Sequence, residues 1–233
     1  MNKVILVTGT RKGIGKSIAE YYLQKGCKVI GISRRMGSID NENYQHYSLN
    51  VSDETLVIKA VKEISKKYGR IDALINNAGV AAMNHLLLTP SEMVKKVFET
   101  NYLGTFLFTR EVSKIMIKQK YGRIVNFSTV AVALKLDGEA VYASSKAAIE
   151  NFTKISSKEL GSFGITVNAI GPTPIETDLI KNVPQQKIDN LIKQQSIKRF
   201  GNFNDVINVI EFFLSDSSEF ITGQIVYLGG INS

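Results

Sequence analysis

The chain has 233 residues, of which 44% are hydrophobic and 21% charged, and this length is enough for one α/β domain with a sizeable core. Cys27 is the only cysteine, so the sequence excludes an intrachain disulfide and a cysteine-built metal cluster, and we expect no bound metal. No stretch approaches the ~20 apolar residues of a membrane span, and no signal peptide is visible. We therefore expect a cytoplasmic protein with no membrane partner.

The formal net charge of +8 has two interpretations. Lysines can simply cover solvated helix faces, or the surface can attract an acidic partner such as a phosphorylated cofactor, an acidic carrier protein or nucleic acid. No basic run with interleaved aromatic residues and no zinc-finger spacing is present, so we expect no nucleic-acid partner.

Short β-branched apolar runs alternate with longer amphipathic stretches along the whole chain. The runs cover residues 3–8, 28–33, 46–49, 72–76, 123–128, 165–170 and 224–228. Several are apolar almost throughout, which is typical of strands covered on both faces. Strands that alternate with helices favour right-handed crossovers. The sequence predicts a single domain over 1–233, a Rossmann-like doubly wound parallel sheet of about seven strands with helices on both faces.

Two segments interrupt this pattern. Residues 34–45 are too short and too polar for a full crossover helix, so we expect an abbreviated loop there. Residues 171–190 contain three of the four prolines, which is typical of a mobile segment beside an active site. We expect a substrate flap over 171–195.

A glycine-rich loop follows the first strand directly and leads into a helical pattern at 18–23. Glycine lets the backbone turn tightly and approach a pyrophosphate, whose charge then meets the helix N-terminus. The spacing G-x-x-x-G-x-G differs from the common dinucleotide fingerprint, and an ordinary glycine turn is the alternative. The predicted cofactor contacts are Gly9, Thr10, Arg11, Lys12, Gly13, Ile14 and Gly15.

The end of the second strand reads Ser33-Arg34-Arg35, with no carboxylate. An acidic residue there binds the ribose hydroxyl of NAD, whereas an arginine accommodates the 2′-phosphate of NADP. Arg34 can offer a planar fork to that phosphate, and Lys12 can add a second cation. The sequence therefore predicts NADP(H) rather than NAD(H), and two solvated arginines are the alternative.

Tyr142 and Lys146 lie four residues apart on a predicted helix over 140–160, so both side chains share one face. A nearby ammonium lowers the pKa of a phenol, which can then donate and accept a proton near neutrality. Such pairs also occur on many surface helices. This pair gains weight because it follows the fifth strand, behind a glycine loop in the right order.

Six motifs in this order resemble those of the short-chain dehydrogenase/reductases over nearly the whole chain. They are Thr8–Gly15, Asn76-Asn77-Ala78-Gly79, Asn101, the Tyr142/Lys146 pair, Asn168–Thr173 and the tail 213–230. The resemblance implies that Tyr142 protonates a carbonyl oxygen during reduction, that Lys146 lowers its pKa and binds the nicotinamide ribose, and that Asn101 holds a proton-relaying water. The nicotinamide would supply the hydride.

The resemblance also implies a hydroxyl thirteen positions before the tyrosine, which is Thr129 in this chain. Alternation in a strand points adjacent side chains to opposite faces, so Thr129 and its neighbour Ser128 cannot both face the substrate equally. The spacing favours Thr129, and Ser128 is the alternative. Further implied cofactor contacts are Asn50, Val51, Asn77, Ala78, Gly79, Pro172, Thr173 and Ile175.

Within that family the chain looks most like the 3-oxoacyl-carrier-protein reductases, which reduce a β-ketoacyl thioester with NADPH. A basic surface would suit an acidic carrier. Phe163, however, stands where those reductases tend to carry a basic residue. A small polar ketone such as a keto sugar therefore remains open as substrate, and a catalytically silent NADP-binding sensor is the other alternative. The resemblance implies a homotetramer or homodimer.

Overall fold

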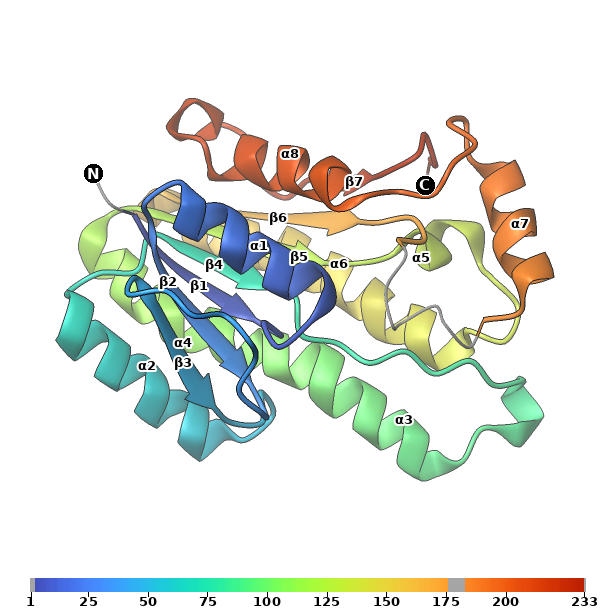
Figure 1. Ribbon diagram of the computed structural model, residues 1–233, viewed down its shortest axis with the longest axis horizontal. Helices are drawn as coiled ribbons and strands as arrows, with labels where there is room; N and C mark the ends of the chain where they lie inside the picture. Colours follow the sequence, from blue (N-terminus) through green and yellow to red (C-terminus); the bar gives the residue numbers. More distant parts are fainter. Residues whose placement is uncertain (1–2, 176–182, 233) are drawn as a thin grey trace.

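The computed structural model describes residues 3–175 and 183–232. Within these ranges the chain forms one seven-stranded sheet in the order β3-β2-β1-β4-β5-β6-β7, in which every neighbouring pair is parallel (Figure 1). The strands are β1 (Val4–Thr8), β2 (Lys28–Ser33), β3 (Tyr44–Ser48), β4 (Ala73–Asn76), β5 (Gly122–Phe127), β6 (Ile165–Gly171) and β7 (Ile225–Tyr227). The order runs outward from β1 in both directions, which confirms the predicted Rossmann-like doubly wound fold.

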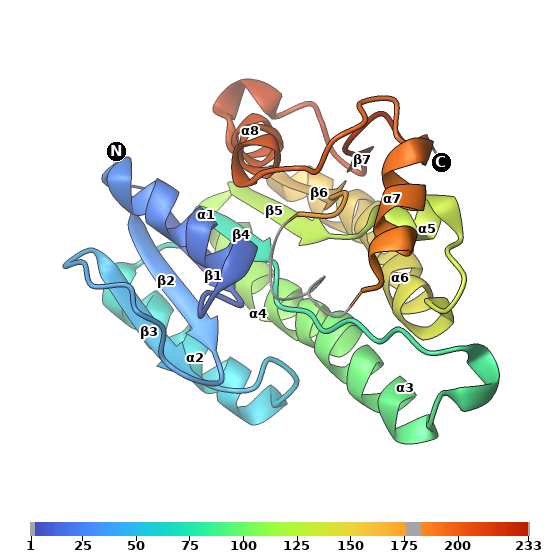
Figure 2. The same ribbon diagram turned by 45° about the vertical axis from the view of Figure 1, so that its right-hand side comes forward.

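Helices cover both faces of the sheet, and each face has its own core (Figures 1 and 2). Leu6 packs with residues of α2 and α4, whereas its neighbours Ile5 and Val7 pack with α1 and α8. Because both faces are buried, the central strands β1 and β4 are apolar almost throughout, whereas the edge strand β3 is more polar and partly exposed. One face carries α2 (Glu54–Tyr68), α4 (Gly104–Gln119) and α6 (Ala140–Leu160), and the other carries α1 (Gly13–Gln24) and α8 (Phe203–Leu214).

The shorter elements lie between these helices and the strands. Helix α3 (Ser91–Phe98) continues into α4 through a π-helical turn, η2 (Glu99–Leu103). The others are η1 (Leu86–Leu88), α5 (Val130–Leu134), η3 (Gly161–Phe163), α7 (Gln185–Gln194) and η4 (Asp216–Ser218).

Both predicted interruptions have counterparts in the structure. No helix lies between β2 and β3, so the predicted abbreviated loop is confirmed. The expected flap over 171–195 contains a helix that was not predicted, α7, which buries Ile188 on one side. Residues 176–182 of the expected flap lie outside the described residues.

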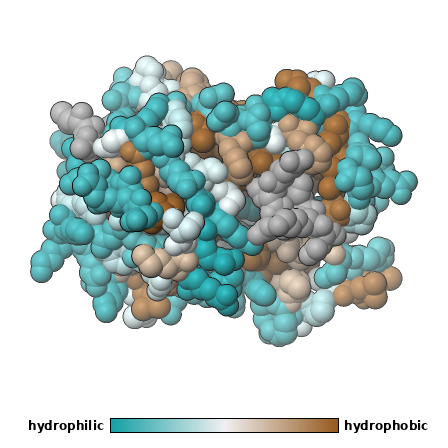
Figure 3. Space-filling model, in the orientation of Figure 1, coloured by the Kyte–Doolittle hydropathy of each residue, from teal (hydrophilic) through white to brown (hydrophobic). Residues whose placement is uncertain are grey.

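The face drawn in Figure 3 is largely hydrophilic, with scattered apolar patches. On α2 the side chains of Lys59, Lys62 and Lys66 are exposed, as expected for a solvated helix face. One apolar exception is η1, whose three leucines are 68%, 85% and 75% exposed. Among the helices that the structure describes, none has the length and apolar character that crossing a bilayer requires.

Candidate active site

The glycine loop lies between β1 and α1 and is folded tightly on itself. Gly9 has φ +80° and Gly13 has φ +61°, in the left-handed region that favours glycine. A Cβ atom on Gly15 would overlap the carbonyl oxygen of Gly9 and the side-chain amide of Asn77. The loop therefore presents bare backbone at the N-terminus of α1, as a pyrophosphate site requires.

The segment after β4 holds this loop in place. The Asn77 amide donates to the carbonyl oxygen of Thr8 at 2.8 Å, and the Ala78 N–H donates to the Thr8 hydroxyl at 2.9 Å. These bonds join the ends of two adjacent strands. The structure thus brings the predicted segment 77–79 beside the predicted glycine loop.

Arg34 and Arg35 lie exposed just beyond the end of β2, in the loop that leads to β3. The Ser33 hydroxyl donates to the backbone oxygen of Arg35 at 2.7 Å and also lies 2.8 Å from Nε2 of His46. Since the single hydroxyl proton goes to Arg35, Nε2 of His46 is the donor to Ser33. Sequence reasoning missed His46, because it reaches Ser33 only through the pairing of β2 with β3.

The implied cofactor contacts Asn50 and Val51 follow β3. Val51 is buried against Gly104, the first residue of α4, where an added Cβ would lie 2.6 Å from a Val51 methyl carbon. Asn50 is exposed beside it. Both residues lie at the carboxyl edge of the sheet, the edge at which the glycine loop also lies.

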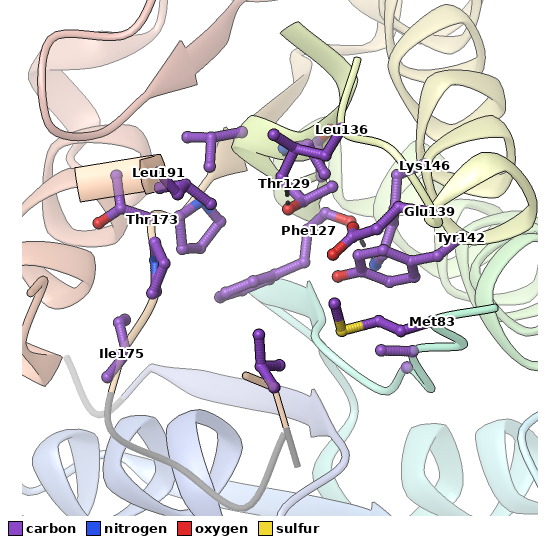
Figure 4. Close-up of a pocket in the computed structure, with 18 of the residues that line it drawn as sticks. Met83, Phe127, Thr129, Leu136, Glu139, Tyr142, Lys146, Thr173, Ile175 and Leu191 are labelled. Atoms are coloured by element: carbon purple, nitrogen blue, oxygen red, sulfur yellow. Dashed lines mark hydrogen bonds between the residues drawn. The ribbon is translucent and has the colours of Figure 1, made fainter. Parts of the chain in front are cut away.

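The pocket in Figure 4 brings together the predicted reacting groups. Tyr142, Lys146 and Thr129 line it with residues of the glycine loop and of the segment after β6, including Ile14, Pro172, Thr173 and Ile175. Sequence reasoning missed several further wall residues, among them Met83, Leu136, Glu139 and Leu191. Arg34, Arg35 and Asn50 lie outside this pocket, so the predicted cofactor site extends from it along the sheet edge.

The pKa values of the tyrosine and the lysine are set mainly by burial. Burial lowers the pKa of Lys146 to about 8, and its ammonium donates to the Phe127 carbonyl oxygen at 2.7 Å. Burial, with the charge of Glu139, raises the pKa of Tyr142 to about 12, although a hydrogen bond with Thr129 lowers it. The protein alone therefore does not produce the lowered phenol pKa that the Tyr142/Lys146 spacing predicts, because desolvation of the phenol and the charge of Glu139 raise that pKa more than the bond with Thr129 lowers it.

The two candidate hydroxyls point to different partners. The Ser128 hydroxyl donates to the Glu150 carboxylate, which also accepts from the Tyr227 hydroxyl at 2.6 Å. The Thr129 hydroxyl instead accepts from the Ala131 N–H at 3.3 Å and bonds with the Tyr142 phenol. This arrangement favours Thr129 as the hydroxyl on the substrate side.

Asn101 is fully buried in the π-helical turn η2. Its side chain accepts from the Val80 N–H at 2.8 Å, and donates to the Val80 carbonyl oxygen and to the Ser145 hydroxyl, both at 3.0 Å. A Cβ on Gly79 would lie 3.4 Å from Oδ1 of Asn101 and 3.5 Å from Nζ of Lys146. Asn101 and Lys146 therefore both lie close to Gly79. π-Helical turns are frequent at functional sites.

We predict that Lys146→Met changes stability in a pH-dependent way. A lysine whose pKa falls from 10.5 to about 8 on folding destabilises the native state by roughly 3 kcal/mol at neutral pH, at about 1.4 kcal/mol per pKa unit. Folding releases the proton, so the wild type gains stability as pH rises from about 8 toward 10.5, while the variant does not.

Urea unfolding of both proteins between pH 7 and 10 measures this difference. The Met variant should have its largest relative advantage at pH 7, and that advantage should shrink above pH 8. Lys158→Met, the same change at an exposed position of α6, is the control. A difference that stays constant with pH would contradict the lowered pKa.

Comparison with known proteins agrees with this geometry. A family profile described as Enoyl-(Acyl carrier protein) reductase matches residues 9–231. The 3-oxoacyl-(acyl-carrier-protein) reductase FabG of Escherichia coli is 32% identical over 234 residues, which cover 98% of this chain and 96% of that protein.

Two solved structures are also similar. The structure of ElxO with NADP bound has a TM-score of 0.90 and 32% identity, and covers 99% of this chain and 98% of that one. The aldohexose dehydrogenase of Thermoplasma acidophilum has a TM-score of 0.90 and 27% identity, and covers 99% and 94%. With the profile match over nearly its whole length, the chain belongs to the short-chain dehydrogenase/reductase family, the family that its motifs predicted.

Proposed function

We propose that this protein is an NADP(H)-dependent oxidoreductase that interconverts a ketone and a secondary alcohol, with a 3-oxoacyl thioester as its substrate. The observation that carries the proposal is the meeting of the Tyr142 phenol, the Thr129 hydroxyl and the Lys146 ammonium in one pocket beside the glycine loop. These groups can hold and protonate a carbonyl oxygen.

The residues present fit a phosphorylated dinucleotide. Glycine at positions 9 and 15 lets the loop pack closely on itself and on the Asn77 amide, and this tight turn at the N-terminus of α1 suits a pyrophosphate. Arg34 and Arg35 are exposed directly after β2, where the 2′-phosphate would lie, and β2 ends in Ser33 rather than in a carboxylate. The similarity to ElxO, whose structure has NADP bound, supports the same cofactor here. When bound, NADPH supplies the hydride.

The protein's own side chains would position the substrate and transfer the proton. Tyr142 donates a proton to the carbonyl oxygen, and the Thr129 hydroxyl holds that oxygen in place. Lys146 lies one helical turn beyond the tyrosine and places a positive charge on the same face of α6. Asn101 orders the Val80 backbone next to Lys146, where a water could relay protons.

The thioester substrate rests on two observations. One is the similarity to FabG of Escherichia coli over nearly the full length of both chains. The other is the apolar wall formed by Met83, Leu136 and Leu191, which suits an acyl chain. A silent sensor is a weaker proposal, because the catalytic set is complete. Cytoplasmic location and assembly as a homotetramer or homodimer stay predictions.

Tyr142→Phe is expected to lower kcat for reduction of a short β-ketoacyl thioester by about 10²–10⁴-fold, the usual contribution of general acid catalysis. NADPH should still bind, because the glycine loop is unchanged. Steady-state NADPH oxidation and NADPH titration measure the two quantities. Tyr102→Phe makes the same chemical change outside the pocket and should keep full activity. Undiminished turnover in Tyr142→Phe would remove the phenol from the mechanism.

Thr129→Ala is expected to lower kcat about 10²-fold, as the loss of one oxyanion donor does. Ser128→Ala should retain most activity, because the Ser128 hydroxyl bonds to Glu150 rather than to the phenol. The same assay compares the two variants. The reverse ranking would show that Ser128 is the substrate-side hydroxyl.

Arg34→Ala is expected to raise the Kd of NADPH about tenfold or more, since a charge-assisted hydrogen bond contributes roughly 1.5–3 kcal/mol. The Kd of NADH should change little, because NADH has no 2′-phosphate, and it serves as the internal control. Fluorescence titration measures both. Tighter binding of NADH than of NADPH by the wild type would contradict the NADP assignment.

A further inference from the structure

The Glu139 carboxylate lies in the wall of the active-site pocket (Figure 4). Glu139 immediately precedes α6 and stands three residues before Tyr142, and side chains with this spacing meet on one helix face. A substrate whose carbonyl oxygen contacts the phenol would therefore bring its neighbouring atoms close to Glu139. None of the reacting steps described above uses this carboxylate.

Within the described part of the chain, the Glu139 carboxylate has no hydrogen-bond donor and no ion-pair partner. The neighbouring walls are apolar, formed by Met83, Leu136 and Leu191. The ammonium of Lys187 is the cation that acts on Glu139, and it lies against Gly138, where an added Cβ would be 3.4 Å from it. Burial raises the pKa of Glu139, and Lys187 opposes the rise.

A half-buried carboxylate without a donor is unfavourable, and a ligand that supplies one removes the penalty. A plain acyl chain supplies none. A hydroxyl or an N–H beside the carbonyl would point its hydrogen at Glu139 while the carbonyl oxygen accepts from Tyr142. The pocket thus has two complementary polar contacts about one helical turn apart.

We propose that the protein has a further activity, the reduction of small ketones that carry a hydroxyl or N–H next to the carbonyl, and that Glu139 is the residue that selects them. This inference rests on the proposed hydride transfer but does not require a thioester substrate. The similar aldohexose dehydrogenase is named for a hydroxyl-rich substrate, which agrees with such a preference in this fold.

The proposed reaction is a carbonyl reduction. The carbonyl carbon gains a hydride from NADPH, the carbonyl oxygen gains a proton from Tyr142, and the products are a secondary alcohol and NADP⁺. The phenol regains its proton from solvent. The hydroxyl or N–H of the substrate stays intact and remains hydrogen-bonded to Glu139.

Hydroxyacetone and methoxyacetone form a pair of probes, because in methoxyacetone a methyl group replaces the hydroxyl hydrogen and so removes the hydrogen-bond donor. In the wild type, kcat/KM with NADPH should be about 10–100-fold higher for hydroxyacetone, the range that one charge-assisted hydrogen bond provides. In Glu139→Met that ratio should fall to within about twofold of one, because neither ketone then has a carboxylate to donate to. Glu139→Gln should give an intermediate ratio.

Glu159→Met, the same change at an exposed position of α6, should leave the ratio unchanged. NADPH titration of each variant confirms that it is folded, and a purely structural role of Glu139 would lower both activities equally. A wild-type ratio near one, or a ratio that survives in Glu139→Met, overturns the proposal. If the wild type reduces neither ketone but reduces a β-ketoacyl thioester, the further activity is overturned and the proposed function stands. Failure with all three substrates overturns both.

Discussion

The amide side chain of Asn101 is the constraint on which the geometry of this site depends. It is fully buried, and its oxygen and nitrogen both bond to the backbone of Val80, the first residue after the Asn77–Gly79 segment. Its nitrogen also donates to the Ser145 hydroxyl, which in turn donates to the carbonyl oxygen of Tyr142 at 2.7 Å. One amide thus connects the loop after β4 to the helix that carries the proposed catalytic pair, and a buried amide with all partners present is costly to disrupt.

The end of β5 is attached to the same helix by two contacts one helical turn apart. Lys146 donates to the carbonyl oxygen of Phe127, and Glu150 accepts from the Ser128 hydroxyl. Thr129 follows directly, so its position relative to Tyr142 is set by groups on either side. This arrangement gives the Ser128 hydroxyl a role in attaching the end of β5 to α6.

Burial in the pocket shifts the pKa values of Tyr142 and Lys146 in opposite directions. Desolvation raises the pKa of Tyr142 and lowers that of Lys146, because it disfavours the charged form of each. A phenol that holds its proton at neutral pH suits a general acid in the direction of reduction. Glu139 strengthens that tendency, and the bond from Thr129 weakens it. A substrate donor on Glu139 would offset part of the carboxylate's effect on the phenol.

Local patterns in the sequence determined most of the fold and much of the site. Some patterns depend only on residues that are close in the sequence, so they can be recognised from the sequence alone. These are the alternation of strands and helices, the glycine spacing and the four-residue separation of Tyr142 and Lys146. Only the tertiary structure gave Ser128 and Thr129 different partners, placed Glu139 in the pocket wall and placed His46 against Ser33. Glu150 lies 22 residues from Ser128 and 77 from Tyr227, so these contacts exist only after distant segments pack together. Periodicity records which face of an element is buried, and it carries no information about which distant side chain meets that face.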